Sequence, residues 1–553
     1  MRPAIVFEPD GYLLDGPKLM GRQSAGNGFL RAAVAAREEE TLICVTPSRE
    51  SANVFQAAVS AMDPVARTEW IPAHRLDLLA HVGLLYRPDV AVAIGARPRM
   101  RVGAGAYSVC GVTHTLSSEA AMTHITNFVA GPVMPWDALI CTSTVAVGVV
   151  RDTMERQRDY LHWRLGATVP TPELQLPLIP LGVHADDFAE TAEDKQAARD
   201  GFALDEGDVV ALFAGRLSFG GKAHPAVMYE ALQRVAERSG RHIVLIQAGH
   251  FINEHVERAF REATAALCPD VRAIFVDGKD FAAYAAAWRA ADLFVSLADS
   301  PQETFGLTPV EAMAAGLPVV VSDWNGYKDT VRDGIDGFRI PTWAPRPGVG
   351  APLATDFEVG ASDYDIYMAR TSTAVAIDRG QLVDRLSDLV GDAGLRARMG
   401  EAGRRRVREL FDWSVVYRQY QALWRELASI RRPLTAEPAT AAWLARAARQ
   451  AANFPDPFDA FRDFATAHVD GQTIVTSEPG ASVARFHELC RIIMLSFFNP
   501  PEAVVARLLD ALAAGPREVA ALAATCGYPE DRAIEAVARM AKLGLVRLAI
   551  PGS

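Results

Sequence analysis

The segment Asp292–Gly326 of this 553-residue chain combines carboxylates with a predicted helix start. After an apolar run, Thr308 is a suitable N-cap and Pro309 suits the first helical position. The free N–H groups and partial positive charge at such a helix end bind phosphate. Glu303 lies in the preceding loop, and Glu311 follows Thr308 at a spacing that also predicts a capping box. Beside a phosphate site, two carboxylates are expected to accept hydrogen bonds from sugar and ribose hydroxyls.

Two cations precede this loop, at the end of another apolar run. Arg216 and Lys222 follow the run Val209–Ala214, which predicts a buried strand. Ligands of open α/β sheets bind at the carboxyl ends of the strands. The two side chains can therefore clamp a diphosphate and stabilise it as it leaves.

Short apolar runs alternate with longer amphipathic stretches over most of the chain. Runs of this length predict strands buried on both faces of a parallel sheet, and their alternation with helices in two series predicts two doubly wound, Rossmann-like α/β domains. The predicted strands are Ala4–Phe7, Thr41–Val45, Val90–Ile94, Tyr107–Val112, Ala138–Cys141, Leu176–Leu181, Val209–Ala214, His242–Ala248, Ala273–Val276, Asp292–Leu297 and Leu317–Ser322.

Changes in composition suggest where the parts of the chain meet. The polar stretch Thr191–Asp200 separates a first domain, residues 1–190, from a second, residues 191–405. Pro341–Asp365 is predicted to be a long loop, and Arg404–Leu427 a long amphipathic helix. Arg431–Pro438 is a candidate linker to a mostly helical accessory domain, residues 431–553. Within that domain, residues 516–548 predict a winged helix-turn-helix unit.

Several motifs, in this order and spacing, resemble family 4 glycosyltransferases of the GT-B fold. They are GRLSFGGK from Gly215, ETFGLTPVE from Glu303 and EAMAAGLPVVVSDWNG from Glu311. The stretches WDALICTS from Trp136, PLGVHAD from Pro180 and FDWSVVYRQYQALW from Phe411 are similar to the last strand of the first domain, the interdomain linker and the terminal helix of that family. The resemblance covers residues 1–430 and implies that residues 406–430 cross back to the first domain.

The resemblance assigns roles to residues of the donor side. Arg216 and Lys222 would hold the diphosphate, Glu303 the hydroxyls of the transferred sugar, and Glu311 the ribose. The backbone N–H groups that would contact the sugar and phosphates belong to Phe305, Gly306, Leu307 and Thr308.

Three further positions follow from the same resemblance. The stretch Gly21–Gly28 is similar to the family's glycine-rich loop, in which Gly26 would approach the donor, although a longer link separates it from the first strand. Gly278, after the predicted strand Ala273–Val276, would lie where the backbone reads the base. His114 follows another strand and is the catalytic candidate of the first domain, as a hydrogen-bond donor or a stabiliser of charge.

The implied reaction moves a sugar from a nucleotide-diphosphate donor to a glycan, lipid or protein acceptor, with retention of configuration and without a metal or cofactor. A sugar-phosphate synthase or a glycan phosphorylase on the same scaffold is an alternative, although no lysine can be nominated to carry pyridoxal phosphate. A nucleotide-sugar-sensing regulatory or interaction protein, using the C-terminal unit, is another. Residues 516–548 contain five basic and four acidic side chains, which favours a protein partner or acceptor positioning over nucleic acid.

Net charge, cysteine spacing and the length of the apolar runs narrow the classes of partner and the cellular location that we expect. The formal net charge of −11 argues against general binding to nucleic acid or anionic membranes. The six cysteines show no metal-ligand or redox spacing, and no apolar run approaches the roughly 20 residues of a membrane span. The N-terminus lacks the pattern of a signal peptide, so a soluble, cytoplasmic protein with reduced thiols is expected.

Overall fold

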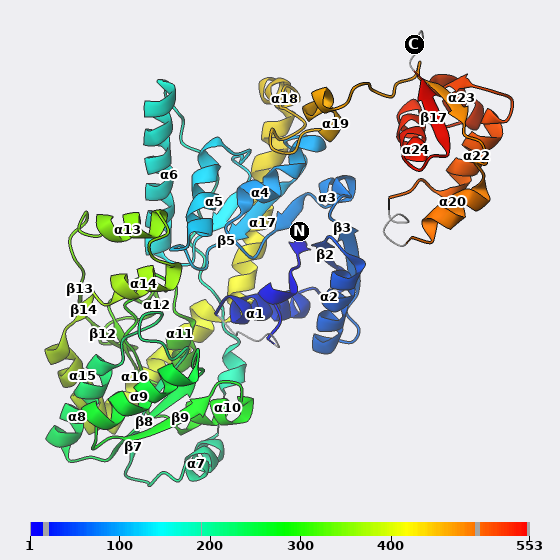
Figure 1. Ribbon diagram of the computed structural model, residues 1–553. Helices are drawn as coiled ribbons and strands as arrows, with labels where there is room; N and C mark the ends of the chain where they lie inside the picture. The colour runs from blue at the N-terminus through cyan, green and yellow to red at the C-terminus, as the bar shows by residue number, and fades with distance from the viewer. Residues whose placement is uncertain (1, 15–20, 190, 493–497, 550–553) are drawn as a thin grey trace. The chain divides into compact units, whose positions relative to one another are not determined.

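The computed structural model describes residues 2–14, 21–189, 191–492 and 498–549. The chain divides into two compact units, Met1–Ala451 and Ala452–Ser553. The first unit contains two six-stranded parallel sheets, which confirms the predicted pair of Rossmann-like domains (Figure 1). In the described part of the chain, no helix combines the length and the apolar character that crossing a membrane requires.

The first sheet has the strand order β3-β2-β1-β4-β5-β6. Alternate residues of each strand face opposite sides, so Ile5 packs with α1 and α2, whereas its neighbour Ala4 packs with α3, α5 and α6. The strands are β1 Ala4–Val6, β2 Leu42–Thr46, β3 Thr68–Pro72, β4 Leu84–Tyr86, β5 Ser108–Val112 and β6 Ala138–Ile140. The helices are α1 Gly21–Ala35, α2 Arg49–Met62, α3 Leu76–Val82, α4 Val92–Ala96, α5 Glu119–Ala130 and α6 Thr144–Leu165.

The second sheet has the order β12-β11-β10-β7-β8-β9 and carries the donor motifs. One face packs with α10 and α11, and the other with α8, α9 and α15. The strands are β7 Val209–Ala214, β8 Ile243–Gly249, β9 Arg272–Asp277, β10 Leu293–Ser296, β11 Val319–Ser322 and β12 Gly337–Ile340. The helices are α7 Ala192–Gly201, α8 Ala226–Ser239, α9 Glu254–Leu267, α10 Phe281–Ala290, α11 Leu307–Ala314, α12 Tyr327–Thr330, α15 Arg379–Gly391 and α16 Ala393–Arg406.

Two of the predicted strands are wrong. Val90–Ile94 is apolar because it enters the buried helix α4, and a short apolar run does not distinguish a buried helix from a strand. Leu176–Leu181 makes only isolated bridges beside β6. Strands β3, β4 and β12 escaped prediction. Strands β3 and β12 lie at sheet edges, where partly exposed residues interrupt the apolar pattern, and the buried strand β4 is only three residues long.

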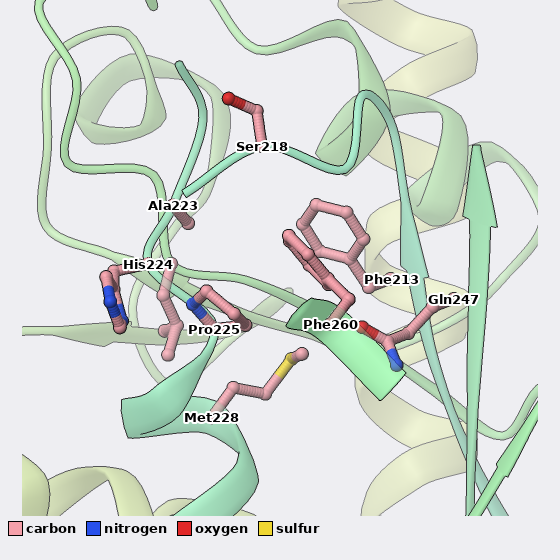
Figure 2. Close-up of a pocket in the computed structure, with 9 residues that line it drawn as sticks. Phe213, Ser218, Ala223, His224, Pro225, Met228, Gln247 and Phe260 are labelled. Carbon is pink, nitrogen blue, oxygen red and sulfur yellow. The ribbon is translucent and has the colours of Figure 1, made fainter. Parts of the chain in front are cut away.

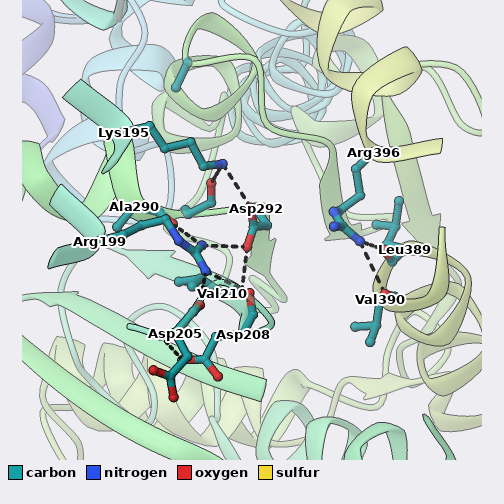
Figure 3. A network of polar contacts seen from close by, with 12 residues as sticks. Lys195, Arg199, Asp205, Asp208, Val210, Ala290, Asp292, Leu389, Val390 and Arg396 are labelled. Atoms are coloured by element: carbon teal, nitrogen blue, oxygen red, sulfur yellow. Dashed lines mark hydrogen bonds and ion pairs between the residues drawn. The ribbon is translucent and has the colours of Figure 1, made fainter. Parts of the chain in front are cut away.

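The polar stretch Thr191–Asp200 forms helix α7, which opens on a capping box between Thr191 and Asp194. Figure 3 shows Lys195 and Arg199 of α7 converging on Asp292, at 2.9 and 3.2 Å from its carboxylate oxygens. Asp292 lies just before β10. It is therefore at the opposite end of this strand from the donor loop, the loop after β10 that carries Gln302 and Glu303. These ion pairs therefore tie α7 to the sheet and take no part in the site.

The segment Pro341–Asp365 is not a single loop as predicted. It belongs to an insertion between β12 and α15 that contains β13 Thr342–Trp343, α13 Ala351–Glu358, α14 Tyr364–Ser372 and β14 Ala376–Ile377, with β13 and β14 paired antiparallel. Helix α13 buries no residue, so its sequence lacks the apolar periodicity that predicts a helix.

Helix α17 (Trp413–Ala436) packs across the first domain against α1. Trp413 fits there because Gly28 and Gly182 carry no side chain, and a Cβ at either position would overlap its ring. The predicted helix Arg404–Leu427 is interrupted by a π-helical turn, η4 (Val407–Phe411), since Asp412 caps a new helix. The linker predicted at 431–438 is also wrong, because α17 continues to Ala436 and α18 (Pro438–Ala445) follows in the same compact unit.

The second unit contains a three-stranded antiparallel sheet of order β16-β15-β17 with helices packed around an apolar core. Helices α23 and α24 join at Gly527, whose φ of 68° suits glycine, and β17 follows. Its elements are α19 Pro457–Ala460, β15 Ile474–Ser477, α20 Val483–Cys490, α22 Glu502–Leu512, β16 Arg517–Glu518, α23 Val519–Cys526, α24 Glu530–Lys542 and β17 Val546–Ala549. The helical character is confirmed, and the winged-helix assignment stays a prediction.

Candidate active site

The two strands β7 and β10 are neighbours in the second sheet, and the loops after them meet at its carboxyl edge. Lys222, from the first loop, places its Nζ 2.8 Å from Oε2 of Glu303 in the second. Arg216 Nη2 donates to Gln302 Oε1 at 2.8 Å and to the carbonyl of Gly221 at 3.3 Å. The structure thus brings together three residues that the sequence assigned to one diphosphate-sugar site.

Glu303 is ionised in this arrangement. Burial by itself would raise the pKa of its carboxyl, of which only 10% is exposed. The charge of Lys222, its hydrogen bond and the N–H groups of Phe305 and Thr304 outweigh that effect and hold the pKa below the usual value. Lys222 and Glu303 therefore form an ion pair at the carboxyl edge of the second sheet.

Helix α11 begins two residues earlier than predicted, at Leu307. Its N-cap is Gly306, with φ of 92°, and an added Cβ there would overlap the ring of Tyr327. Thr308 is therefore inside the helix and not its N-cap, and no side chain caps this end. Phe305 and Gly306 precede the helix, and the first-turn N–H groups of Leu307 and Thr308 lack partners within it.

Glu311 differs from Glu303 in its surroundings. Burial raises the pKa of its carboxyl to about 7, and the charge of Lys222 offsets this only in part. The capping box proposed from its spacing to Thr308 does not form, since the helix starts at Leu307. Glu311 instead borders a cavity of about 180 Å³ whose other walls include Tyr284 and Trp288 of α10.

His114 lies where the first domain touches the donor loop. Thr304 Oγ1 donates to the His114 carbonyl at 2.6 Å, and Thr115 Oγ1 donates to the Gln302 carbonyl at 3.3 Å. Burial, and then the charge of Arg22, lowers the pKa of the His114 imidazole to about 4. His114 is therefore neutral at physiological pH, which favours a hydrogen-bonding role over stabilisation by positive charge.

The two predicted site glycines differ in their positions. The stretch containing Gly26 is not a loop, because Gly21 to Gly28 form the first turns of α1. Gly26 packs there against Gly11, whose carbonyl a Cβ would overlap, so glycine reflects helix packing. Gly278 follows β9 at the carboxyl edge of the sheet, where its N–H donates to the Gly249 carbonyl at 2.8 Å.

Sequence reasoning missed Asp299, Gln302 and Tyr364. Asp299 is 4% exposed, burial raises its pKa to about 7, and its N–H donates to the Lys222 carbonyl at 3.3 Å. Asp299 and Gln302 lie in the segment Asp292–Gly326 that the sequence pattern singled out. Only their contacts with Lys222 and Arg216, from the loop after β7, set them apart from the other residues of that segment. A second cavity, shown in Figure 2 beside His224, measures about 10 Å³ and is too small for a substrate.

The comparisons with known proteins agree with this geometry. Residues 194–345 match the family model "Glycosyl transferases group 1". The phosphatidyl-myo-inositol mannosyltransferase of Mycobacterium tuberculosis is 30% identical over 250 residues, which are 45% of this chain and 54% of the relative. The D-inositol 3-phosphate glycosyltransferase of Geodermatophilus obscurus is 32% identical over 168 residues, 30% of this chain and 36% of the relative. The chain thus spans about half the length, or less, of these curated relatives.

A solved structure shows the same fold over a larger part of the chain. The Anabaena protein HepE in complex with UDP superposes with a TM-score of 0.50 and 15% identity, covering 77% of this chain and 100% of its own. That likeness supports the GT-B arrangement of the two sheets. Together with the match to the family model over residues 194–345 and the donor motifs, it supports the resemblance of the chain to family 4 glycosyltransferases.

Proposed function

We propose that the protein transfers a sugar from a nucleotide-diphosphate-sugar donor to a hydroxyl of a glycan, lipid or protein acceptor. The observation that carries the proposal is the ion pair between Lys222 and Glu303 at the carboxyl edge of the second sheet. It places a cation for phosphate and a carboxylate for sugar hydroxyls side by side. The neighbouring guanidinium of Arg216 contacts only neutral acceptors, Gln302 and the Gly221 carbonyl, among the hydrogen bonds described.

The donor would bind to Lys222 in place of Glu303, and to N–H groups of Arg216 while Nη2 keeps its bond to Gln302. The diphosphate gives both cations charge-assisted hydrogen bonds, which are stronger than a bond to a neutral acceptor such as Gln302. As the bond between sugar and phosphate breaks, negative charge grows on the leaving diphosphate, and both cations stabilise it. Glu303 keeps its negative charge and accepts hydrogen bonds from the sugar, while the unpaired N–H groups at the start of α11 face the phosphates.

The nucleoside and the reacting sugar would occupy opposite ends of this arrangement. Glu311 and the cavity beside it suit the ribose, and Gly278 lies at the sheet edge expected for the base. His114, neutral and next to Thr304, faces the sugar position from the first domain. Its single N–H donates to the Pro88 carbonyl, so its other ring nitrogen would accept a hydrogen bond from a sugar hydroxyl. Retention of configuration and independence from metal remain part of the proposal, supported by the family resemblance and by the cations at the diphosphate position.

The described residues of the C-terminal unit, 452–492 and 498–549, fold around their own apolar core. Binding of a protein partner and a cytoplasmic location remain predictions from the sequence.

The test combines nucleotide binding with turnover. Wild-type protein is titrated with UDP, GDP and ADP by calorimetry, and the matching nucleotide sugars are then assayed for hydrolysis and transfer. Lys222→Ala and Glu303→Ala should each lower turnover by at least about 100-fold, as loss of an essential charge-stabilising group does. Arg238→Ala, which removes a cation that is 59% exposed on α8, is the control and should leave turnover unchanged. Full activity in both site variants would refute the assignment.

A further inference from the structure

The insertion between β12 and α15 folds against the loop that carries Arg216 and Lys222. Ser372 Oγ of α14 donates to the Gly220 carbonyl at 3.2 Å, and a Cβ at Gly220 would overlap Ala369. The contact therefore needs glycine in the cation loop. Helix α14 is held in turn by α13, through the ion pair between Arg370 and Asp356 at 2.7 Å.

Tyr364, the first residue of α14, links this insertion to the first domain. Its hydroxyl lies 2.7 Å from Ser117 Oγ, in the segment that follows β5 and also contains His114. Burial raises the pKa of this hydroxyl, and hydrogen bonds with Ser117 and Gln302 oppose the shift. One hydroxyl therefore contacts both domains of the first compact unit.

Gln302 connects Tyr364 to Arg216, the residue proposed to bind the diphosphate. Its side-chain oxygen accepts from Arg216 Nη2 at 2.8 Å, and its backbone carbonyl accepts from Thr115 of the first domain. Tyr364 is also close enough to Arg216 for the guanidinium to influence its pKa. Ser117, Tyr364, Gln302 and Arg216 thus form a continuous chain of polar contacts from the first domain to the guanidinium.

We propose that Tyr364 is a positioning residue that, through Gln302, holds Arg216 in the orientation that binds the donor diphosphate when the two α/β domains are closed. Separation of the domains would remove Ser117 and Thr115 from this chain, so that Tyr364 and Gln302 would keep only their partners within the second domain. The inference rests on the proposed function, since it assumes that Arg216 binds the diphosphate.

The experiment measures the affinity of the full-length protein for UDP, GDP and ADP by calorimetry and follows the nucleotide that binds most tightly. Tyr364→Phe keeps the ring and removes the hydroxyl. It should weaken binding about 3- to 10-fold, as the loss of one hydrogen bond does. Ser117→Ala should weaken it to a similar extent, and the double variant no further, because both act through one chain of contacts.

A second comparison separates positioning from mere support of the fold. In an Arg216→Ala background, Tyr364→Phe should leave the affinity unchanged, whereas a general loss of structure would lower it again. Tyr367→Phe is the matched control, since Tyr367 lies one turn along the same helix with its ring stacked on Phe357.

Two results overturn the proposal: unchanged affinity in Tyr364→Phe, or a further loss when that change is added to Arg216→Ala. Absence of nucleotide binding by the wild-type protein would instead overturn the proposed function itself. Thermal unfolding of each variant confirms that the proteins compared are folded.

Discussion

Glu303 and Glu311 lie eight residues apart, yet their carboxyl groups should affect stability in opposite directions as pH changes. The pKa of Glu311 is raised from its ordinary value of 4.5 to about 7 by burial. At pH values between the unfolded pKa and the higher folded pKa, the carboxyl is protonated in the folded protein but ionised in the unfolded chain. Stability should therefore fall as pH rises through this window, and Glu311→Gln should remove that loss.

The magnitude follows from the two pKa values. A shift of about 2.5 units, at 1.36 kcal/mol per unit, costs about 3 kcal/mol at pH 8, where Glu311 is ionised in both states. At pH 5 the folded carboxyl is protonated, and the same relation leaves a cost of only about 1 kcal/mol. Relative to wild type, Glu311→Gln should gain about 2 kcal/mol of unfolding free energy between pH 5 and pH 8.

Glu303→Gln is the matched comparison. The pKa of Glu303 is lowered, mainly because Lys222 outweighs the effect of burial, so its ionised form stabilises the protein above the unfolded pKa. That contribution is lost as pH falls through the folded-state pKa. Glu303→Gln should therefore be less stable than wild type at pH 7, because Lys222 loses its partner, and the deficit should narrow in acid.

Urea unfolding followed by tryptophan fluorescence measures both effects. All nine tryptophans precede residue 452, so the signal reports the compact unit that contains the site. Titrations at intervals from pH 3.5 to pH 8 give the free energy of unfolding of each variant relative to wild type, and their acid end covers the titration of Glu303, whose pKa lies below 4.5. A difference for Glu311→Gln that stays constant over this range would refute the reasoning, as would equal pH dependence in the two variants.

Two further predictions concern packing. Gly182→Ala should lower the free energy of unfolding by at least about 2 kcal/mol, because the new Cβ would overlap the Trp413 ring. Gly148→Ala in α6 is the control: its Cβ meets no atom within 4 Å, so the change should be neutral or slightly stabilising. Thermal melts compare the two variants. Asp137→Asn should lower the free energy of unfolding in urea by about 3–5 kcal/mol, because Arg99 and Asp137 are both 0% exposed and the guanidinium would keep an uncompensated charge. A loss below about 1 kcal/mol would contradict a buried ion pair.

The sequence by itself predicted the α/β class, most strands of both sheets and the residues that meet at the donor site. Buried parallel strands are continuous apolar runs, and a helix start beside paired charges is a local pattern, so both can be recognised within short windows. Arg216, Lys222, Glu303 and Glu311 were found in this way. The edge strands β3 and β12, the three-residue strand β4 and the exposed helix α13 lack such patterns and were missed.

Only the tertiary structure decided how these residues act together. The opposite pKa shifts of Glu303 and Glu311 depend on burial and on the distance to Lys222, which comes from another strand of the sheet. The same holds for Gly26, whose role is to pack against Gly11. Tyr364 lies 247 positions from its partner Ser117. Electrostatics and close packing depend on distances in space, which the fold sets between segments far apart in the chain.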